Sequence, residues 1–225
     1  GGLNYIGTPG IAGGPFFVLD RKGRDGYHRG RGGTGVETLQ ELLERAEETG
    51  ESVRGVAFEN ETITGLDFYK IDLEQVTFTG CRFVGCDFTK AGLYECVFAG
   101  CDFSNIPFRE SYWKRCTVTD CKGDGADLSM AVLRLGEIRD SSLCYANFYE
   151  AALEELLFQN TRCRSAGFQK VKWKKVRLER VVLSGAEFFR TSLKGVDLSD
   201  CEIDGITVSE SLAELKGVKI SAHQA

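Results

Sequence analysis

The sequence predicts an all-β solenoid, in which the chain winds repeatedly and stacks each coil on the one before. Three observations lead to this fold class. From residue 56 to residue 210 a large apolar residue recurs at nearly every fifth position, beginning with Phe58, Ile63 and Phe68. A small or aliphatic residue usually stands two positions before it, and no insertion interrupts the register. A period of five fits neither an α-helix nor an ordinary β-strand, so the repeat itself indicates the architecture.

Each five-residue unit is expected to be a short strand followed by a corner. We number the positions of a pentad 1 to 5, with Val56 at position 1. Residues two apart point to the same side only in extended backbone, so positions 1 and 3, such as Cys86 and Phe88, point inward together. We therefore expect the strand at positions 1 to 3. The remaining positions are rich in polar residues and glycine, which favour turns. Stacked coils then pair in parallel ladders about 4.8 Å apart.

The five-residue pattern resembles that of the pentapeptide-repeat proteins. The resemblance rests on units such as CDFTK at 86–90, CDFSN at 101–105, ADLSM at 126–130, ANFYE at 146–150 and VDLSD at 196–200. It implies that family's right-handed quadrilateral β-helix, with four pentads to a coil and about eight coils over residues 56–210. Residues twenty apart then stack, so Phe68, Phe88 and Phe108 are expected to form one column of the core.

The two tryptophans of the repeat agree with a square coil. Residues ten apart lie on opposite walls of such a coil, and Trp113 stands ten residues from Gly123, while Trp173 stands ten from Cys163. Close packing requires a large residue to face a small one. We therefore expect Trp173→Ala to leave a cavity that Cys163 cannot fill.

The two ends of the repeat carry expected caps. Residues 36–55 are predicted to be a capping helix and linker, because Thr34 to Glu37 fits a capping box and Leu39, Leu42, Leu43 and Ala46 have helical spacing before Gly50. Residues 211–225 are predicted to be a C-terminal cap, and SAHQA at 221–225 is typical of the start of another helix, so we expect the cap to continue. The resemblance implies that such an end can form a homodimer. Residues 1–35 hold twelve glycines and a basic cluster, and are predicted to be a basic, glycine-rich arm.

Nine cysteines occur, and seven of them share position 1 of the pentad. At that position they are expected to be small buried hydrophobes with reduced thiols. Their C-x4-C spacing lacks the close Cys and His pairs of a zinc site, and both histidines, His28 and His223, lie outside the repeat. We expect no metal, no cofactor and no catalytic residues, because a filled core leaves no pocket in which polar groups converge.

The composition indicates a folded protein and bears on its partners. A hydrophobic content of 42% favours a folded core. The formal net charge of −5 disfavours direct binding to nucleic acid. No apolar run is long enough to span a membrane, and the start lacks a secretory pattern. We expect a soluble protein of a reducing compartment, the cytoplasm, that acts through its surface.

Charge is distributed unevenly over that surface. Residues 161–195 hold ten lysines or arginines against two glutamates, whereas residues 56–110 hold nine acidic against four basic residues. The candidate partner residues are three outward aspartates and four cations: Asp72, Asp87, Asp102, Lys172, Lys174, Lys175 and Arg177.

Two functions remain open on this evidence. The first is a non-catalytic scaffold that presents the flat faces of a rigid rod to another protein, through either the basic residues or the arm. The second is implied by the resemblance: some family members are acidic mimics of DNA that bind DNA gyrase or topoisomerase IV and protect it from quinolones or toxins. The acidic half of the repeat agrees with the second function, whereas the basic residues interrupt a continuous DNA-like surface.

Overall fold

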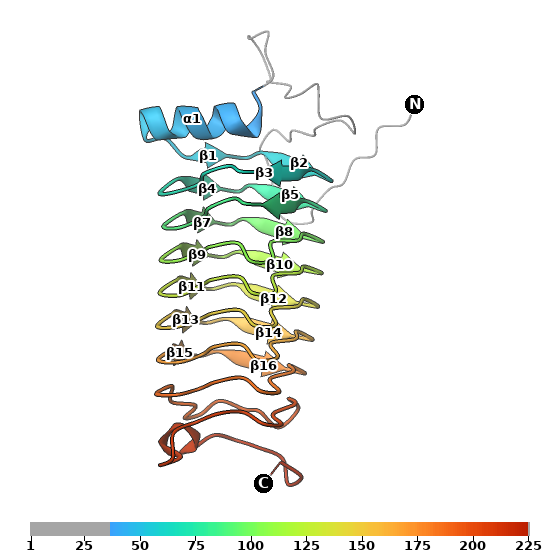
Figure 1. Ribbon diagram of the computed structural model, residues 1–225, viewed down its shortest axis with the longest axis vertical. Coiled ribbons are helices and arrows are strands. Elements are labelled where there is room, and N and C mark those ends of the chain that lie inside the picture. The colour runs from blue at the N-terminus through green and yellow to red at the C-terminus, as the bar shows by residue number, and fades with distance from the viewer. Residues whose placement is uncertain (1–36, 225) are drawn as a thin grey trace.

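The computed structural model describes residues 37–224, and the predicted arm at 1–35 lies outside them. These residues form a straight solenoid with helix α1 across one end (Figure 1). Each turn uses twenty residues, because parallel partners differ by twenty in number: Phe58 lies opposite Phe78, and Phe78 opposite Phe98. The right-handed quadrilateral β-helix expected from the sequence is confirmed.

Two of the four faces are continuous seven-stranded sheets that extend over about six turns of the rod. Face 1 is, in order, β1 (Val53–Arg54), β4 (Asp72–Glu74), β7 (Gly92–Tyr94), β9 (Tyr112–Lys114), β11 (Val132–Arg134), β13 (Ala152–Glu154) and β15 (Lys172–Lys174). Face 2 is β2 (Ala57–Glu59), β5 (Thr77–Thr79), β8 (Val97–Ala99), β10 (Thr117–Thr119), β12 (Glu137–Arg139), β14 (Leu157–Gln159) and β16 (Arg177–Glu179). The strands cover positions 2 to 4 of the pentad, one residue later than the alternation predicts.

The other two faces are held mainly by single bridges. Face 3 begins with β3 (Thr62–Thr64) paired to β6 (Arg82–Val84) and continues through isolated bridges such as that between Asp102 and Lys122. Face 4 has isolated bridges only within the described residues, among them the one between Asp67 and Asp87. The residue at position 5 adopts a left-handed conformation at almost every corner, which turns the chain by the angle that a square requires.

The predicted number of coils is too high. The two long sheets cover about six turns. Beyond β16 the chain keeps the repeat but pairs only through isolated bridges, such as those of Val182 with Glu202 and Asp197 with Lys219. A coil near the end has no full coil beyond it to complete its ladders, so regular strands stop before the repeat does.

Columns of side chains fill the interior, and the predicted aromatic column is confirmed. The ring centroids of Phe68 and Phe88 are 3.9 Å apart, and those of Phe88 and Phe108 are 4.8 Å apart. The expected pairing of Trp113 with Gly123 across the coil stays a prediction. Along its own column, a Cβ at Gly123 would meet Phe103, one turn before it, and Leu143, one turn after. Packing along a column therefore compensates for the missing side chain.

Helix α1 (Leu39–Thr49) covers the first coil. Its apolar side chains, Leu39, Leu42, Leu43 and Ala46, are buried, and Gly50 ends it in a left-handed conformation with φ 71°. Burial of these four side chains removes the open apolar end that a solenoid would otherwise expose to water.

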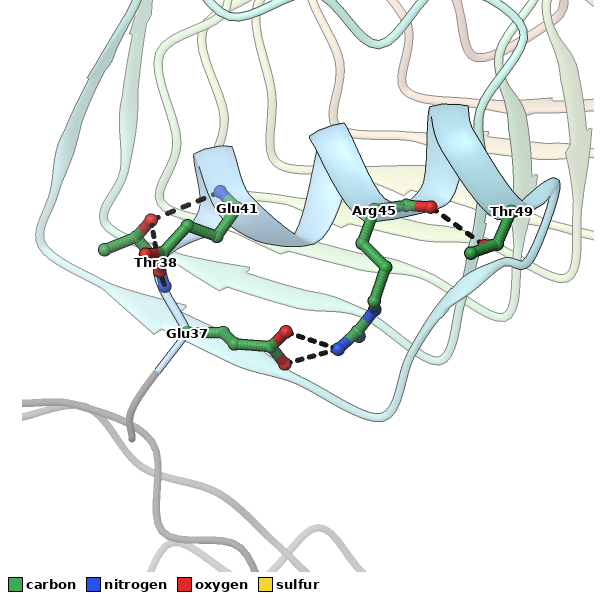
Figure 2. A network of polar contacts seen from close by, with 5 residues as sticks. All are labelled: Glu37, Thr38, Glu41, Arg45 and Thr49. Carbon is green, nitrogen blue, oxygen red and sulfur yellow. Dashed lines mark hydrogen bonds and ion pairs between the residues drawn. The ribbon is translucent and has the colours of Figure 1, made fainter. Parts of the chain in front are cut away.

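The capping box of α1 lies one turn later than the sequence pattern indicates. Thr38 Oγ1 accepts a hydrogen bond from Glu41 N at 3.2 Å, and Glu41 Oε2 accepts one from Thr38 N at 2.6 Å (Figure 2). Glu37 forms an ion pair with Arg45, and Thr34, its expected partner in the capping box, lies outside the described residues. The segment contains two T-x-x-E patterns, and only the second directly precedes the helical run.

The C-terminal end is closed by a 3₁₀ turn, Ala213–Leu215, rather than by a second α-helix. Glu214 is buried there, and its carboxylate accepts hydrogen bonds from Arg190 N at 2.8 Å and from Ser209 Oγ at 2.6 Å. Residues 221–224 form turns, and Gln224 Nε2 donates to Leu198 O and Cys201 O. The C-terminal homodimer stays a prediction.

The cysteines are free thiols, and all but Cys144 are buried. Three of them form a column in which each thiol donates to the carbonyl 23 residues earlier, as Cys101 Sγ does to Phe78 O at 3.2 Å. Burial raises the pKa of Cys201 to about 11, so its reactive thiolate is scarce at neutral pH.

Thiol labelling is expected to separate Cys144 from the other eight. With Ellman's reagent, the native protein should release about one equivalent of product quickly, because only a partly exposed thiol is accessible. Full reaction should require unfolding in guanidinium. Fast release of several equivalents from the native protein would contradict the burial of the cysteine columns.

Candidate interaction surface

The three candidate aspartates lie on three different faces. Asp72 belongs to β4 on face 1, Asp87 lies on face 4 and Asp102 on face 3. They therefore form no common patch, although they are close in sequence. A partner that contacts one flat face of the rod can reach only one of them.

Two of these aspartates stabilise their own corners. Asp87 Oδ1 accepts a hydrogen bond from Thr89 N at 2.7 Å, and Asp102 Oδ1 accepts one from Ser104 N at 3.0 Å. Partial burial opposes ionisation of Asp102, but the hydrogen bonds from Ser104 outweigh it and lower the pKa of Asp102. Asn147 makes the same bond to Tyr149 N at 3.0 Å without a charge. The contact therefore needs an oxygen acceptor but no carboxylate.

Asp72 has a different environment. It stands in an extended strand, and its carboxylate lies over Gly92, where a side chain would otherwise be. Burial raises its pKa, and the neighbouring Glu74 raises it further. Glu74 itself accepts from Ser52 and forms an ion pair with Arg54 at 3.0 Å. The acidic end of face 1 is thus partly neutralised from within.

The four candidate cations, by contrast, come together on one turn. Lys172 and Lys174 project from β15, Lys175 occupies the corner and Arg177 begins β16. We call these four residues the basic belt. They span face 1, the next corner and the edge of face 2, and all four are exposed.

Glutamates of the preceding turn lie beside the belt. Glu154 forms an ion pair with Lys174, and Glu155 pairs with Lys175 at 3.0 Å. Glu154 also pairs with Arg134 at 2.7 Å, so one carboxylate serves two cations. Within the described part of the chain Lys172 has no ion pair. Cations are therefore in excess along this stretch.

The cations of the belt are open to solvent. The side chains of Lys174, Lys175 and Arg177 are 66%, 69% and 69% exposed, whereas that of Glu154 is only 19% exposed. An exposed pair such as that of Lys175 with Glu155 contributes about 0–1 kcal/mol, so a partner with carboxylates can replace it at little cost. Glu154 and Glu155 were not among the candidate residues predicted from the sequence, although their offset of twenty residues from Lys174 and Lys175 is the signal that the repeat provides.

The described residues offer no metal centre. Among residues 37–224, no three His, Cys, Asp or Glu side chains lie close enough together to hold a metal ion. In the same part of the chain, no helix is both long and apolar enough to cross a membrane. The polar chemistry that the structure does present lies on the outside of the rod.

The fold and this surface define a quadrilateral β-helix that carries its chemistry on flat faces. The chain belongs to the pentapeptide-repeat family: the family model "Pentapeptide repeat region" matches residues 91–168, and "Pentapeptide repeats (8 copies)" matches 67–105 and 161–200. Together the matches cover more than half of the chain. The comparison with curated proteins finds no match.

Solved structures of the same fold are similar to this chain. A trypsin-treated variant of QnrB1, a plasmid-mediated fluoroquinolone resistance protein, is 26% identical, with a TM-score of 0.51 over 75% of this chain and 84% of that one. HetL, a pentapeptide-repeat protein involved in heterocyst differentiation regulation in the cyanobacterium Nostoc sp. strain PCC 7120, is 19% identical, with a TM-score of 0.55 over 81% and 96%. The likeness to HetL concerns the fold alone.

Proposed function

We propose that this chain is a non-catalytic interaction module that docks another protein through the basic belt. The observation that carries the proposal is that Lys172, Lys174, Lys175 and Arg177 meet on one turn of the rod and stay exposed. Charges placed in this way steer and orient an acidic partner.

The part of the solenoid beneath the basic belt is rigid, which favours docking of a partner. Trp173 and Leu178 pack against the core beneath the belt strands, and backbone ladders join β15 and β16 to the turn before them. A surface held rigidly before binding loses little conformational entropy when a partner arrives. The free cysteines agree with a reducing compartment such as the cytoplasm, which we include in the proposal.

Charge reversal of the belt tests this function. The triple variant Lys174→Glu, Lys175→Glu, Arg177→Glu is expected to weaken binding of the partner recovered from the protein's own cell extract by at least about tenfold, or about 1.4 kcal/mol. Binding is measured by interferometry on the immobilised protein, and melting temperatures confirm that the variant is folded. A matched control is the triple variant Asp72→Asn, Asp87→Asn, Asp102→Asn, which keeps the corner acceptors as Asn147 does. Loss of binding in the control with retention in the belt variant would contradict the proposal.

A second candidate function has one observation in its favour. The likeness to QnrB1 at 26% identity, together with the acidic residues 56–110, supports a DNA mimic that binds gyrase or topoisomerase IV. The separation of Asp72, Asp87 and Asp102 onto three faces weakens this alternative. Binding to purified DNA gyrase at low salt, lost in the asparagine triple variant, together with protection of supercoiling from a fluoroquinolone, would favour the mimic over the scaffold.

A further inference from the structure

The repeat pattern is inverted at Leu135 and Gly136. Leu135 occupies position 5, a corner that is filled in the neighbouring turns by Glu95, Arg115, Glu155 and Lys175. Gly136 occupies position 1, where the residues of the same column are Cys96, Cys116, Leu156 and Val176. An apolar residue is therefore outside where polar ones are usual, and the side chain that should fill the wall is absent.

Leu135 leaves apolar surface in contact with water. Its side chain is 43% exposed, and its φ of 59° is the left-handed conformation that the corners of this fold share. The conformation therefore belongs to the fold, whereas the exposed apolar surface does not contribute to the core. Departures from the usual sequence pattern of this kind are expected at functional sites.

A groove lies at this inversion. It has a volume of about 600 Å³ and follows the corner between faces 1 and 2. Its apolar lining is Cys116, Leu135, Gly136, Leu156, Leu157 and Val176. Four successive turns contribute to it, so it extends over three coil spacings, roughly 14 Å, which is the length of about four residues of extended chain.

The floor of the groove has a small notch at Gly136. Glycine is required there because a Cβ would lie 2.6 Å from Cys116 O, so no side chain of residue 136 can fill the notch. A second cavity of about 20 Å³ shares Cys116, Gly136 and Leu156 with the groove and reaches Trp113 and Ile138 of the core. This volume holds about one water molecule or one methyl group. Because most of its lining is apolar, a methyl group suits it better than water.

The charged rim indicates the chemistry beside the notch. Lys175 and Arg177 of the basic belt line the groove, together with Arg115, Glu137 and Glu155. Arg115 is bound to Glu95 at 2.6 Å, whereas Arg177 has only a 3.6 Å contact with Glu179. With Lys172 nearby and unpaired among the described residues, this end of the groove favours carboxylates.

We propose that the groove binds an extended segment of a partner protein in which one aliphatic residue is flanked by acidic residues. The aliphatic side chain packs on Leu135 and Leu156 with its terminal methyl group at the Gly136 notch, and the carboxylates face Lys175 and Arg177. The inference rests on the proposed docking function and names the chemistry that the belt recognises.

A phage-displayed library of random twelve-residue peptides, selected on the folded protein, tests the inference. Enriched peptides should share a leucine, isoleucine or valine next to aspartate or glutamate. Their affinities, measured by fluorescence polarisation, should fall by about tenfold or more in Leu135→Gln and in Arg177→Glu. Gln75 already occupies the same corner position with φ 54°, so Leu135→Gln is compatible with the fold. Lys122→Glu, which reverses an exposed lysine on face 3 outside both the groove lining and the basic belt, is the matched control and should change affinity less than about twofold.

Two results would contradict the proposal that the groove binds a peptide segment. One is the absence of any enriched peptide, and the other is enrichment of peptides whose affinity is the same for Leu135→Gln and for the unchanged protein. Measuring partner binding with Leu135→Gln distinguishes failure of the groove proposal from failure of the proposed docking function. Partner binding that is lost on belt reversal but kept in Leu135→Gln retains the docking function and rejects the groove, whereas binding that survives both rejects the docking function.

Discussion

Replacing Trp113 by alanine is expected to lower the free energy of unfolding by about 3–5 kcal/mol. Trp113 is 5% exposed, and its ring centroid lies 5.2 Å from that of Phe108 and 5.6 Å from that of Phe98. Its Nε1 donates to Ser111 Oγ at 2.8 Å, so the truncation leaves a cavity and also removes a satisfied buried hydrogen bond. Denaturant unfolding followed by circular dichroism measures the loss.

Trp173 is the matched comparison for this variant. The sequence predicts that Trp173→Ala leaves a cavity that Cys163 cannot fill. However, Trp173 is only partly buried, and Val171 occupies the position that corresponds to Ser111 beside Trp113. Within the described residues its buried Nε1 finds no acceptor. We therefore expect Trp173→Ala to cost roughly 1–2 kcal/mol. Equal losses for the two variants would show that burial and the Ser111 contact do not decide the effect.

Acid is expected to loosen the C-terminal end through Glu214. The hydrogen bonds from Ser209, with that from Arg190 N, lower the pKa of Glu214 to about 2, below the value of about 4.3 for an unfolded chain. A carboxyl with a lowered folded-state pKa contributes its full stability above the unfolded value. That contribution is lost as the pH falls from about 5 towards 2.

The comparison with Glu214→Gln isolates this contribution from those of other carboxyls. Above pH 5 the unchanged protein should melt at a higher temperature than Glu214→Gln, and the difference should disappear near pH 2. Glu214→Ala should lower the free energy of unfolding by about 2 kcal/mol at pH 7, because Arg190 N and Ser209 N lose a charged acceptor. A melting difference between protein and Gln variant that does not vary with pH would contradict the assigned pKa.

The five-residue period was sufficient to predict a solenoid, and the resemblance to the pentapeptide-repeat family supplied the four pentads of each coil. Phe68, Phe88 and Phe108 stack as this coil of twenty residues requires, and Leu42 and Leu43 of α1 are buried as their helical spacing indicates. The ends were predicted less well. Residues beyond β16 lack partners for complete ladders, and the C-terminal closure depends on Glu214, which is outside the repeat and has no periodic signal.

For the candidate site, the sequence predicts the grouping of the cations but not the separation of the aspartates. The belt cations are neighbours in sequence and lie on one turn, so any solenoid would bring them together. The aspartates show the reverse case: fifteen residues separate both Asp72 from Asp87 and Asp87 from Asp102, and that offset places each on another face of a twenty-residue turn. The groove at Gly136 was not predicted, because the close approach of Cys116 O to Gly136 depends on how neighbouring turns pack and has no signal in the sequence.

Acetylation footprinting of lysines tests the docking function most directly. The protein, free and bound to its partner, is treated with the N-hydroxysuccinimide ester of acetic acid, and mass spectrometry compares the modification of each lysine. We expect Lys172, Lys174 and Lys175 to be protected in the complex. Lys70 and Lys90, at the corner between faces 4 and 1 and about four turns or more along the rod from the belt, should react equally in both states. Unchanged reactivity of the three belt lysines in the complex, with protection at Lys70 and Lys90 instead, would contradict a partner surface at the basic belt.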